Sequence, residues 1–169
     1  MLDFDGMFSS EEAKKLYKKT FLLNLFKKFC VRMEKNSNYK KRVLNLYRQS
    51  YNQEQTIAGL IEQEFNYKMS EDESKTMFLW VKANLLKSQT RKPISLEIKK
   101  ELYQQQNGKC MGCGEDLGLD WSKIHVDHII PFKLVGDELP NNYQDLCQIC
   151  NESKSCSTDY LFRALLKLN

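Results

Sequence analysis

The sequence predicts a mainly α-helical protein in two parts, a helical N-terminal domain over residues 1–92 and a smaller domain over residues 93–169. Glycine and proline separate the parts, because only two of the seven glycines and none of the three prolines precede residue 93. Capping patterns and apolar spacings typical of helices fill the first part. The second part holds two Cys-x-x-Cys pairs, which predict loops and short strands around a metal.

Capping residues and apolar periodicity place the helices. Ser9 with Glu12 and Ser70 with Glu73 form capping-box patterns, and Ser95 is a third N-cap. The expected helices cover about 10–35, 39–50, 53–67, 71–87, 96–106 and 158–168. In the first of these, one apolar face is made by Leu22, Phe26, Phe29, Cys30 and Met33. We expect this face to enter the core of the N-terminal domain.

The N-terminal domain is strongly basic over residues 14–48, where 12 Lys or Arg face Glu34 alone, a net charge of +11. Such a surface attracts phosphate backbones without reading their sequence. The candidate phosphate contacts are Lys14, Lys15, Lys18 and Lys19. Two alternatives stay open: an ordinary solvated helix face, or a docking surface for an acidic partner protein.

Residues 1–8 are acidic and aromatic, unlike a signal peptide, and no apolar run is long enough to span a membrane. We therefore expect a cytoplasmic protein without membrane contact, in which cysteines stay reduced rather than forming disulfides. Cys30 and Cys156 stand outside the two pairs and are expected to be a buried residue and a free thiol.

The two cysteine pairs are Cys110 with Cys113 and Cys147 with Cys150. Four thiolates at this double spacing predict a closed, tetrahedral structural zinc site. The pairs are 33 residues apart, longer than the roughly 15–20 residues of an ordinary zinc ribbon. The extra length carries His125-x-Asp127-His128, so the zinc is expected to hold a second, chemical site in place.

The residue types of this second site suit phosphodiester hydrolysis, which needs a nucleophilic water, a base and a cation. His128 is the natural base, because the pKa of an unperturbed imidazole lies near neutrality. Asp127 and Asn151 offer hard oxygen ligands, which suit Mg²⁺ or Mn²⁺ better than zinc.

Together these elements resemble the HNH, or ββα-metal, nuclease family. The resemblance spans about residues 96–156 and rests on the cysteine pairs, His125-x-Asp127-His128-x-x-Pro131, Gly136-Asp137, Asn142, and Asn151-x-x-Lys154. The chain departs from the family's name at Asn151, where the third signature residue is often histidine. The resemblance implies a small zinc-stapled ββα-metal domain, in which Asp127 and Asn151 bind one catalytic metal and His128 activates water.

Three further residues have open roles. The resemblance implies that Asn142 supports a loop or the imidazole, whereas an asparagine there is also a good cap for a helix. For His125 three roles stay open: support of the site, contact with the substrate, or an ordinary strand residue. Lys154 either contacts a phosphate or is a solvated lysine.

The expected function is divalent-metal-dependent hydrolysis of DNA by an HNH endonuclease of the restriction, homing or defence type. One active site cuts one strand, so a double-strand break needs a homodimer, a partner protein or two encounters. The alternatives are a zinc-stabilised module that binds nucleic acid or protein without catalysis, and an RNA-cutting toxin.

Overall fold

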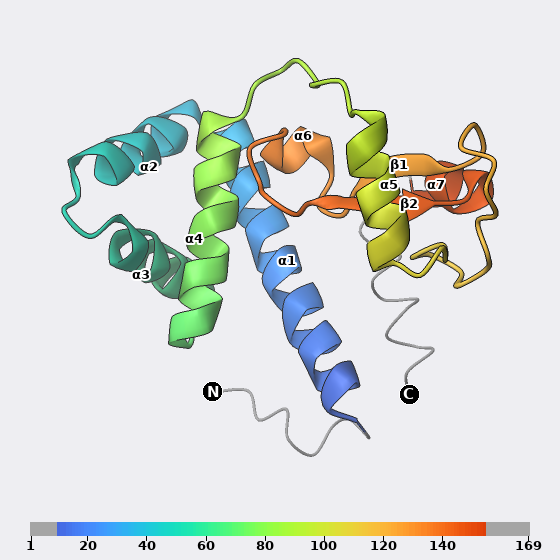
Figure 1. The fold of residues 1–169 in the computed structure, drawn as a ribbon. Helices are drawn as coiled ribbons and strands as arrows, with labels where there is room; N and C mark the ends of the chain where they lie inside the picture. Colours follow the sequence, from blue (N-terminus) through green and yellow to red (C-terminus); the bar gives the residue numbers. More distant parts are fainter. Residues whose placement is uncertain (1–9, 155–169) are drawn as a thin grey trace.

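The structure, a computed structural model, describes residues 10–154. In this range it has seven helices and one two-stranded sheet, which confirms the predicted mainly α fold (Figure 1). Four helices come first: α1 (Glu11–Lys35), α2 (Ser37–Gln49), α3 (Gln53–Phe65) and α4 (Glu71–Leu86). They are followed by α5 (Leu96–Gln105), β1 (His125–His128), α6 (Phe132–Val135), β2 (Tyr143–Leu146) and α7 (Gln148–Lys154). The helix predicted at 158–168 and Cys156 lie outside the described residues.

Side-chain caps decide where the helices begin. At α4, the Ser70 hydroxyl accepts a hydrogen bond from the Glu73 backbone N–H, and the Glu73 carboxylate accepts one from the Ser70 N–H. The predicted capping box is therefore confirmed, as is the Ser95 cap of α5. The cap of α1 is Ser10, one residue after the predicted Ser9, which lies outside the described range.

Two boundaries differ from the prediction for local reasons. Helix α2 begins at Ser37, two residues early, because the Asn36 side chain accepts a hydrogen bond from the Tyr39 N–H and caps the helix there. Helix α3 ends at Phe65, two residues early, because Asn66 adopts the left-handed conformation with a φ of 51°.

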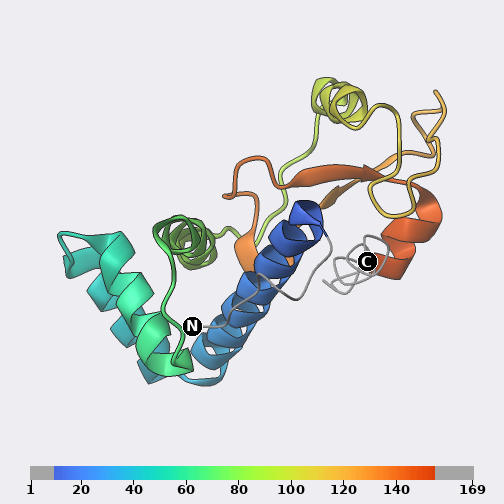
Figure 2. The ribbon, with the colours of Figure 1, turned by 90° about the horizontal axis from the view of Figure 1, so that it is seen from below.

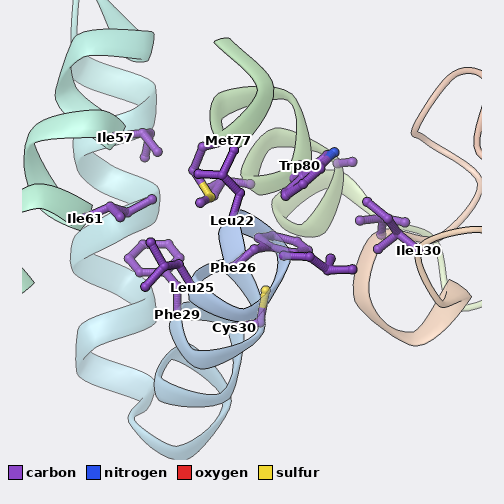
Figure 3. Close-up of a cluster of buried hydrophobic side chains, with 14 of the residues drawn as sticks. Leu22, Leu25, Phe26, Phe29, Cys30, Ile57, Ile61, Met77, Trp80 and Ile130 are labelled. Atoms are coloured by element: carbon purple, nitrogen blue, oxygen red, sulfur yellow. The ribbon is translucent and has the colours of Figure 1, made fainter. Parts of the chain in front are cut away.

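One apolar cluster holds α1, α3 and α4 together (Figure 3). The predicted face of α1 is buried as expected, and its members are at most 4 % exposed: Leu22, Phe26, Phe29, Cys30 and Met33. Ile57 and Ile61 from α3 and Met77, Trp80 and Val81 from α4 also belong to the cluster. Full burial of an aliphatic or phenylalanine side chain stabilises a fold by about 1.5–3 kcal/mol before entropy is counted.

The same cluster extends past residue 92. Ile130 and Val135 belong to it, and Figure 3 shows Ile130 facing Trp80 and Phe26. Helix α6 lies against α4, where the Asn84 amide donates a hydrogen bond to the Leu134 carbonyl at 2.6 Å (Figure 1). Residues on both sides of position 92 therefore share one hydrophobic core. The division into two domains at residue 92 stays a prediction.

Strands β1 and β2 form an antiparallel ribbon in which His125 pairs with Leu146 and His128 with Tyr143. Helix α5 packs on β2, and α7 packs on both strands. Figure 2 shows α5 on one side of the ribbon and α7 on the other. Successive residues of β1 therefore alternate between a face toward α5 and a face toward α7.

Candidate active site and zinc centre

The four cysteines predicted as ligands converge on one point. The first pair lies in the loop after α5, and the second lies where β2 passes into α7. Their four Sγ atoms lie within 4.8 Å of one another, and Cys113 Sγ is 3.9 Å from Cys147 Sγ. A tetrahedral zinc ion with Zn–S bonds of about 2.3 Å places its thiolates about 3.8 Å apart. The four thiols therefore fit one structural zinc ion.

Backbone amides prepare this centre for a thiolate. Cys110 Sγ accepts hydrogen bonds from the amides of Gly112 and Cys147, each at 3.3 Å. Burial raises the pKa of the Cys110 thiol, but the amide hydrogen bonds outweigh burial and lower the pKa to about 7. Gly112 is also required by space, because a Cβ there would lie 2.7 Å from Cys150 Sγ. The loop thus suits a metal ligand better than a neutral thiol.

Asp127 lies in β1 on the face toward α7. Its Oδ2 forms an ion pair with Lys154 Nζ at 2.6 Å, and the same ammonium donates a hydrogen bond to the His128 carbonyl at 2.6 Å. Lys154 is 3 % exposed, so the alternative of a solvated lysine is wrong. Within residues 10–154, Asp127 Oδ2 accepts no hydrogen bond of good geometry. Lys154 nonetheless occupies this oxygen as an ion pair, and the carboxylate as a whole offers the hard oxygen ligands that a cation such as Mg²⁺ prefers.

Asn151 and His125 lie near this carboxylate in the fold. Asn151 stands one turn before Lys154 on α7, and side chains at that spacing share a helix face. Its N–H donates to the Cys147 carbonyl at 3.0 Å, which ties this turn to the cysteine centre. His125 begins β1 and shares a strand face with Asp127. The metal role of Asn151 and the substrate role of His125 stay predictions.

His128 ends β1 on the face opposite to Asp127 and is 5 % exposed. Its Nε2 lies 2.7 Å from Oδ1 of Asp137, a residue of the loop after α6. The same carboxylate oxygen accepts a hydrogen bond from the Tyr143 hydroxyl at 2.8 Å, and Asp137 Oδ2 accepts one from the Lys92 backbone N–H at 2.7 Å. The imidazole is therefore part of a buried polar network rather than a free side chain.

The charges in this network follow from its hydrogen bonds. Burial raises the pKa of Asp137, but donors from Lys92, His128 and Tyr143 outweigh it, so the pKa of this carboxyl lies below its usual value. An ionised carboxylate only accepts hydrogen bonds, so the His128 proton stands on Nε2. Burial and the hydrogen bond to Asp137 raise the pKa of Tyr143 to about 12, so its hydroxyl remains a donor.

Asn142 holds the loop that follows β1. Its Oδ1 accepts a hydrogen bond from the Ile130 N–H at 2.8 Å, and its Nδ2 donates to the Ile130 carbonyl at 2.9 Å. Asn142 precedes strand β2, so the alternative of a helix cap is wrong. The resemblance implied that Asn142 supports either a loop or the imidazole. Its hydrogen bonds to Ile130 are those of loop support.

The basic residues of α1 do not all stand in the same environment. Lys15, Lys18 and Lys19 are exposed, whereas Lys14 is half-buried and pairs with Glu11 at 2.8 Å. Phosphate contact by any of the four stays a prediction. None of the helices in residues 10–154 is long and apolar enough to cross a membrane.

Asp137, Tyr143 and Lys92 take part in the site although no motif in the sequence predicts a role for them. Asp137 offered one signal, a carboxylate next to Gly136 in the stretch between the two strands. Tyr143 offered none beyond its place in a strand. Lys92 contributes a backbone N–H, which no pattern of side chains indicates.

The comparisons with known proteins agree with this geometry. The family model described as HNH endonuclease matches residues 110–156. The matched range contains both cysteine pairs together with Asp127, His128 and Asn151. A search of the curated proteins gives no match.

Proposed function

We propose that the chain is a divalent-metal-dependent endonuclease that hydrolyses DNA, because residues 110–156 match the family model described as HNH endonuclease. One observation carries the proposal: the cysteine centre joins the loop after α5 to the start of α7, which carries Asn151. Strand β2 leads into this centre and pairs with β1, which carries Asp127 and His128. An HNH domain implies a nucleic-acid substrate. The oxygen ligands support a hard divalent cation, and the basic helices support a polyanionic duplex.

Asp127 and Asn151 would hold one Mg²⁺ or Mn²⁺ ion. The Asp127 carboxylate supplies hard oxygen ligands, and its ion pair with Lys154 fixes it against α7, which also carries Asn151. When bound, the ion offsets negative charge that develops on the phosphate and on the leaving oxygen. Lys154 adds a fixed positive charge at the same carboxylate, where it favours a bound phosphate.

His128 would act as the general base. It takes a proton from the attacking water, and its Nε2–H stays hydrogen-bonded to Asp137 during the transfer. Burial of the ring excludes bulk water, which strengthens the electrostatic interactions around it. A positioned base of this type contributes about 10²- to 10⁴-fold to a rate.

Helices α1 and α2 would hold the substrate. Residues 14–48 carry a net charge of +11, whereas residues 93–169 carry −3, so the catalytic part gains from a basic neighbour. The exposed Lys15, Lys18 and Lys19 are the proposed phosphate contacts, with Lys14 as a weaker fourth because Glu11 pairs with it.

A single active site would nick one strand. Cleavage of both strands would then need a homodimer, a partner protein or a second encounter. We place this activity in the cytoplasm, where thiols stay reduced and free to bind zinc.

The test uses the full-length protein with zinc bound and three substrates: supercoiled plasmid, linear duplex DNA and structured RNA. Each is incubated with EDTA, with Mg²⁺ and with Mn²⁺. The proposal expects nicked and then linear plasmid with either cation and intact plasmid with EDTA.

Two outcomes contradict it. Binding of nucleic acid without cleavage under every condition supports a zinc-stabilised binding module instead. Cleavage of RNA with intact DNA supports the RNA-cutting alternative.

A further inference from the structure

Asp137 is a carboxylate held on both of its oxygens beside His128. Its side chain is 3 % exposed. Oδ1 accepts from His128 Nε2 and from the Tyr143 hydroxyl, at 2.7 and 2.8 Å, and Oδ2 accepts from the Lys92 amide at 2.7 Å. With donors on both oxygens, the carboxylate cannot rotate without losing a hydrogen bond.

The Lys92 amide belongs to the linker between α4 and α5. The same linker also approaches the His128 ring through Arg91 and Phe132. The Arg91 guanidinium lies 5.0 Å from the centre of the Phe132 ring, and the Phe132 ring lies 5.4 Å from the His128 ring. The linker passes close because residue 136 is glycine: a Cβ on Gly136 would lie 2.8 Å from Lys87 Cβ.

Resting on the proposed nuclease function, we propose that Asp137 is a positioning residue for His128, and that the α4–α5 linker holds Asp137 in place through the Lys92 N–H. His128 and Asp137 are 9 positions apart in the sequence, whereas Lys92 and Asp137 are 45 positions apart. The position of His128, the proposed base, therefore depends on the linker that follows the N-terminal helices.

The proton balance shows what Asp137 contributes. Because the carboxylate only accepts hydrogen bonds, His128 keeps its proton on Nε2 and its lone pair on Nδ1. When water attacks phosphorus, a P–O bond forms to the water oxygen, an O–H bond of the water breaks and an N–H bond forms at Nδ1. The P–O bond to the leaving oxygen breaks with its electron pair, and that oxygen takes a proton from solvent. The ring is then an imidazolium, and the fixed carboxylate 2.7 Å from Nε2 stabilises its charge. Without Asp137 the ring can rotate or change tautomer, and the lone pair no longer faces the water.

A double-mutant cycle tests whether Asp137 acts through His128. Asp137→Asn keeps the size of the side chain and removes its charge, and we expect kcat for plasmid nicking to fall by about 10- to 100-fold with little change in KM. In a His128→Ala background, Asp137→Asn should cause no further loss, since no imidazole is left to position. Equal melting temperature and zinc content in the variants exclude a general effect on folding.

Nuclear magnetic resonance supplies a readout that does not need activity. The chain has two histidines, so ¹⁵N ring spectra of the wild type and of His125→Ala assign His128. We expect the Nε2–H tautomer of His128, with an Nε2 proton protected from exchange that Asp137→Ala removes. An Nδ1–H tautomer in the wild type overturns the proposal even if every variant fails to fold.

The linker has its own matched pair of variants. Lys92→Pro removes the N–H that holds Asp137 Oδ2 and should lower kcat by about the same factor as Asp137→Asn. Thr90→Pro places a proline in the same linker, away from Asp137, and should keep nicking activity. Equal loss in both variants shows that the linker conformation matters but not this hydrogen bond, which overturns the linker half of the proposal.

The failures are separable. If His128→Ala is fully active, the proposed role of His128 falls and the positioning role falls with it. If His128→Ala is inactive while Asp137→Asn is fully active, only the positioning role is wrong. A loss from Asp137→Asn that is as large in the His128→Ala background as in the wild type makes Asp137 purely structural.

Discussion

Helices α1 to α4 bury a row of large apolar side chains, whereas strands β1 and β2 bury mainly polar ones. The buried strand residues are His128, Gln144, Asp145 and Leu146, of which only the last is apolar. A two-stranded ribbon is at best marginally stable alone. Hydrophobic burial therefore orders helices α1 to α4, whereas the ribbon of β1 and β2 depends on the cysteine centre and on a network of polar contacts.

Loss of a zinc ligand should break the second region alone and have the largest effect. In Cys147→Ser we expect loss of bound zinc and unfolding of the ribbon and α7, because zinc binding contributes apparent free energies of about 10–16 kcal/mol to such folds. Elemental analysis and circular dichroism check this, with most helical signal retained by α1 to α4. As a control, Cys30→Ala should bind zinc normally, since Cys30 lies in the helical core.

A variant without zinc that melts like the wild type would contradict this difference between the regions. It would mean that the four thiols pack as a small core of their own. The separation of the Sγ atoms, all within 4.8 Å, argues for a shared ion.

Truncation in the helical core should act on both regions. Phe26 is fully buried, so Phe26→Ala should lower the free energy of unfolding by about 3–5 kcal/mol. Ile130 packs in the same cluster, so we expect one unfolding transition followed by both helical and ribbon signals. Denaturant titration measures this, with the fully exposed Tyr51→Ala as a control that changes stability by less than about 0.5 kcal/mol. Two separate transitions would show that the regions are independent domains.

The basic surface should change substrate affinity rather than stability. Replacing Lys15, Lys18 and Lys19 together with alanine should weaken duplex binding about equally for all sequences. It should also reduce the log–log salt slope by roughly 0.9 per lost phosphate contact. Lys14→Ala should have less effect, because Lys14 is paired with Glu11. An unchanged slope in the triple variant would make these lysines a solvated face, and loss of a protein contact would make them a docking surface.

The capping box at α4 should give the smallest change. Ser70→Ala removes the side-chain acceptor for the Glu73 N–H and should cost about 1 kcal/mol. Thermal melting measures it, and Ser37→Ala, inside α2 and outside a capping position, is the matched control. A loss of several kcal/mol would mean that the start of α4 is held by more than its cap.

The fold was predictable from the sequence where neighbouring residues determine the structure. Apolar spacing in α1 and capping at Ser70 and Ser95 depend on neighbouring residues, and both predictions are confirmed. Boundaries were missed where a single side chain or backbone angle decides, as at Asn36 and Asn66. The packing of Ile130 on Trp80 joins residues 50 positions apart, and no local pattern contains that information.

The candidate site was predictable in its residue types but not in its supports. The convergence of the four cysteines follows from their spacing, because each Cys-x-x-Cys pair forms one turn that presents two thiolates to the same metal ion. The hydrogen bonds of Asp137 to His128, and of the Lys92 amide to Asp137, depend on how the linker crosses the α6 loop. Burial of Lys154 was missed for the same reason, since its partner Asp127 lies in a strand 27 positions earlier.

The rate of plasmid nicking by His128→Ala measures whether His128 is the general base. Supercoiled plasmid is incubated with Mg²⁺ or Mn²⁺ and with either wild type or variant, at matched zinc content and melting temperature. We expect the wild type to nick the plasmid and the variant to be slower by about 10²- to 10⁴-fold while binding duplex DNA equally well. A His128→Ala protein that nicks plasmid at the wild-type rate would contradict this role of His128.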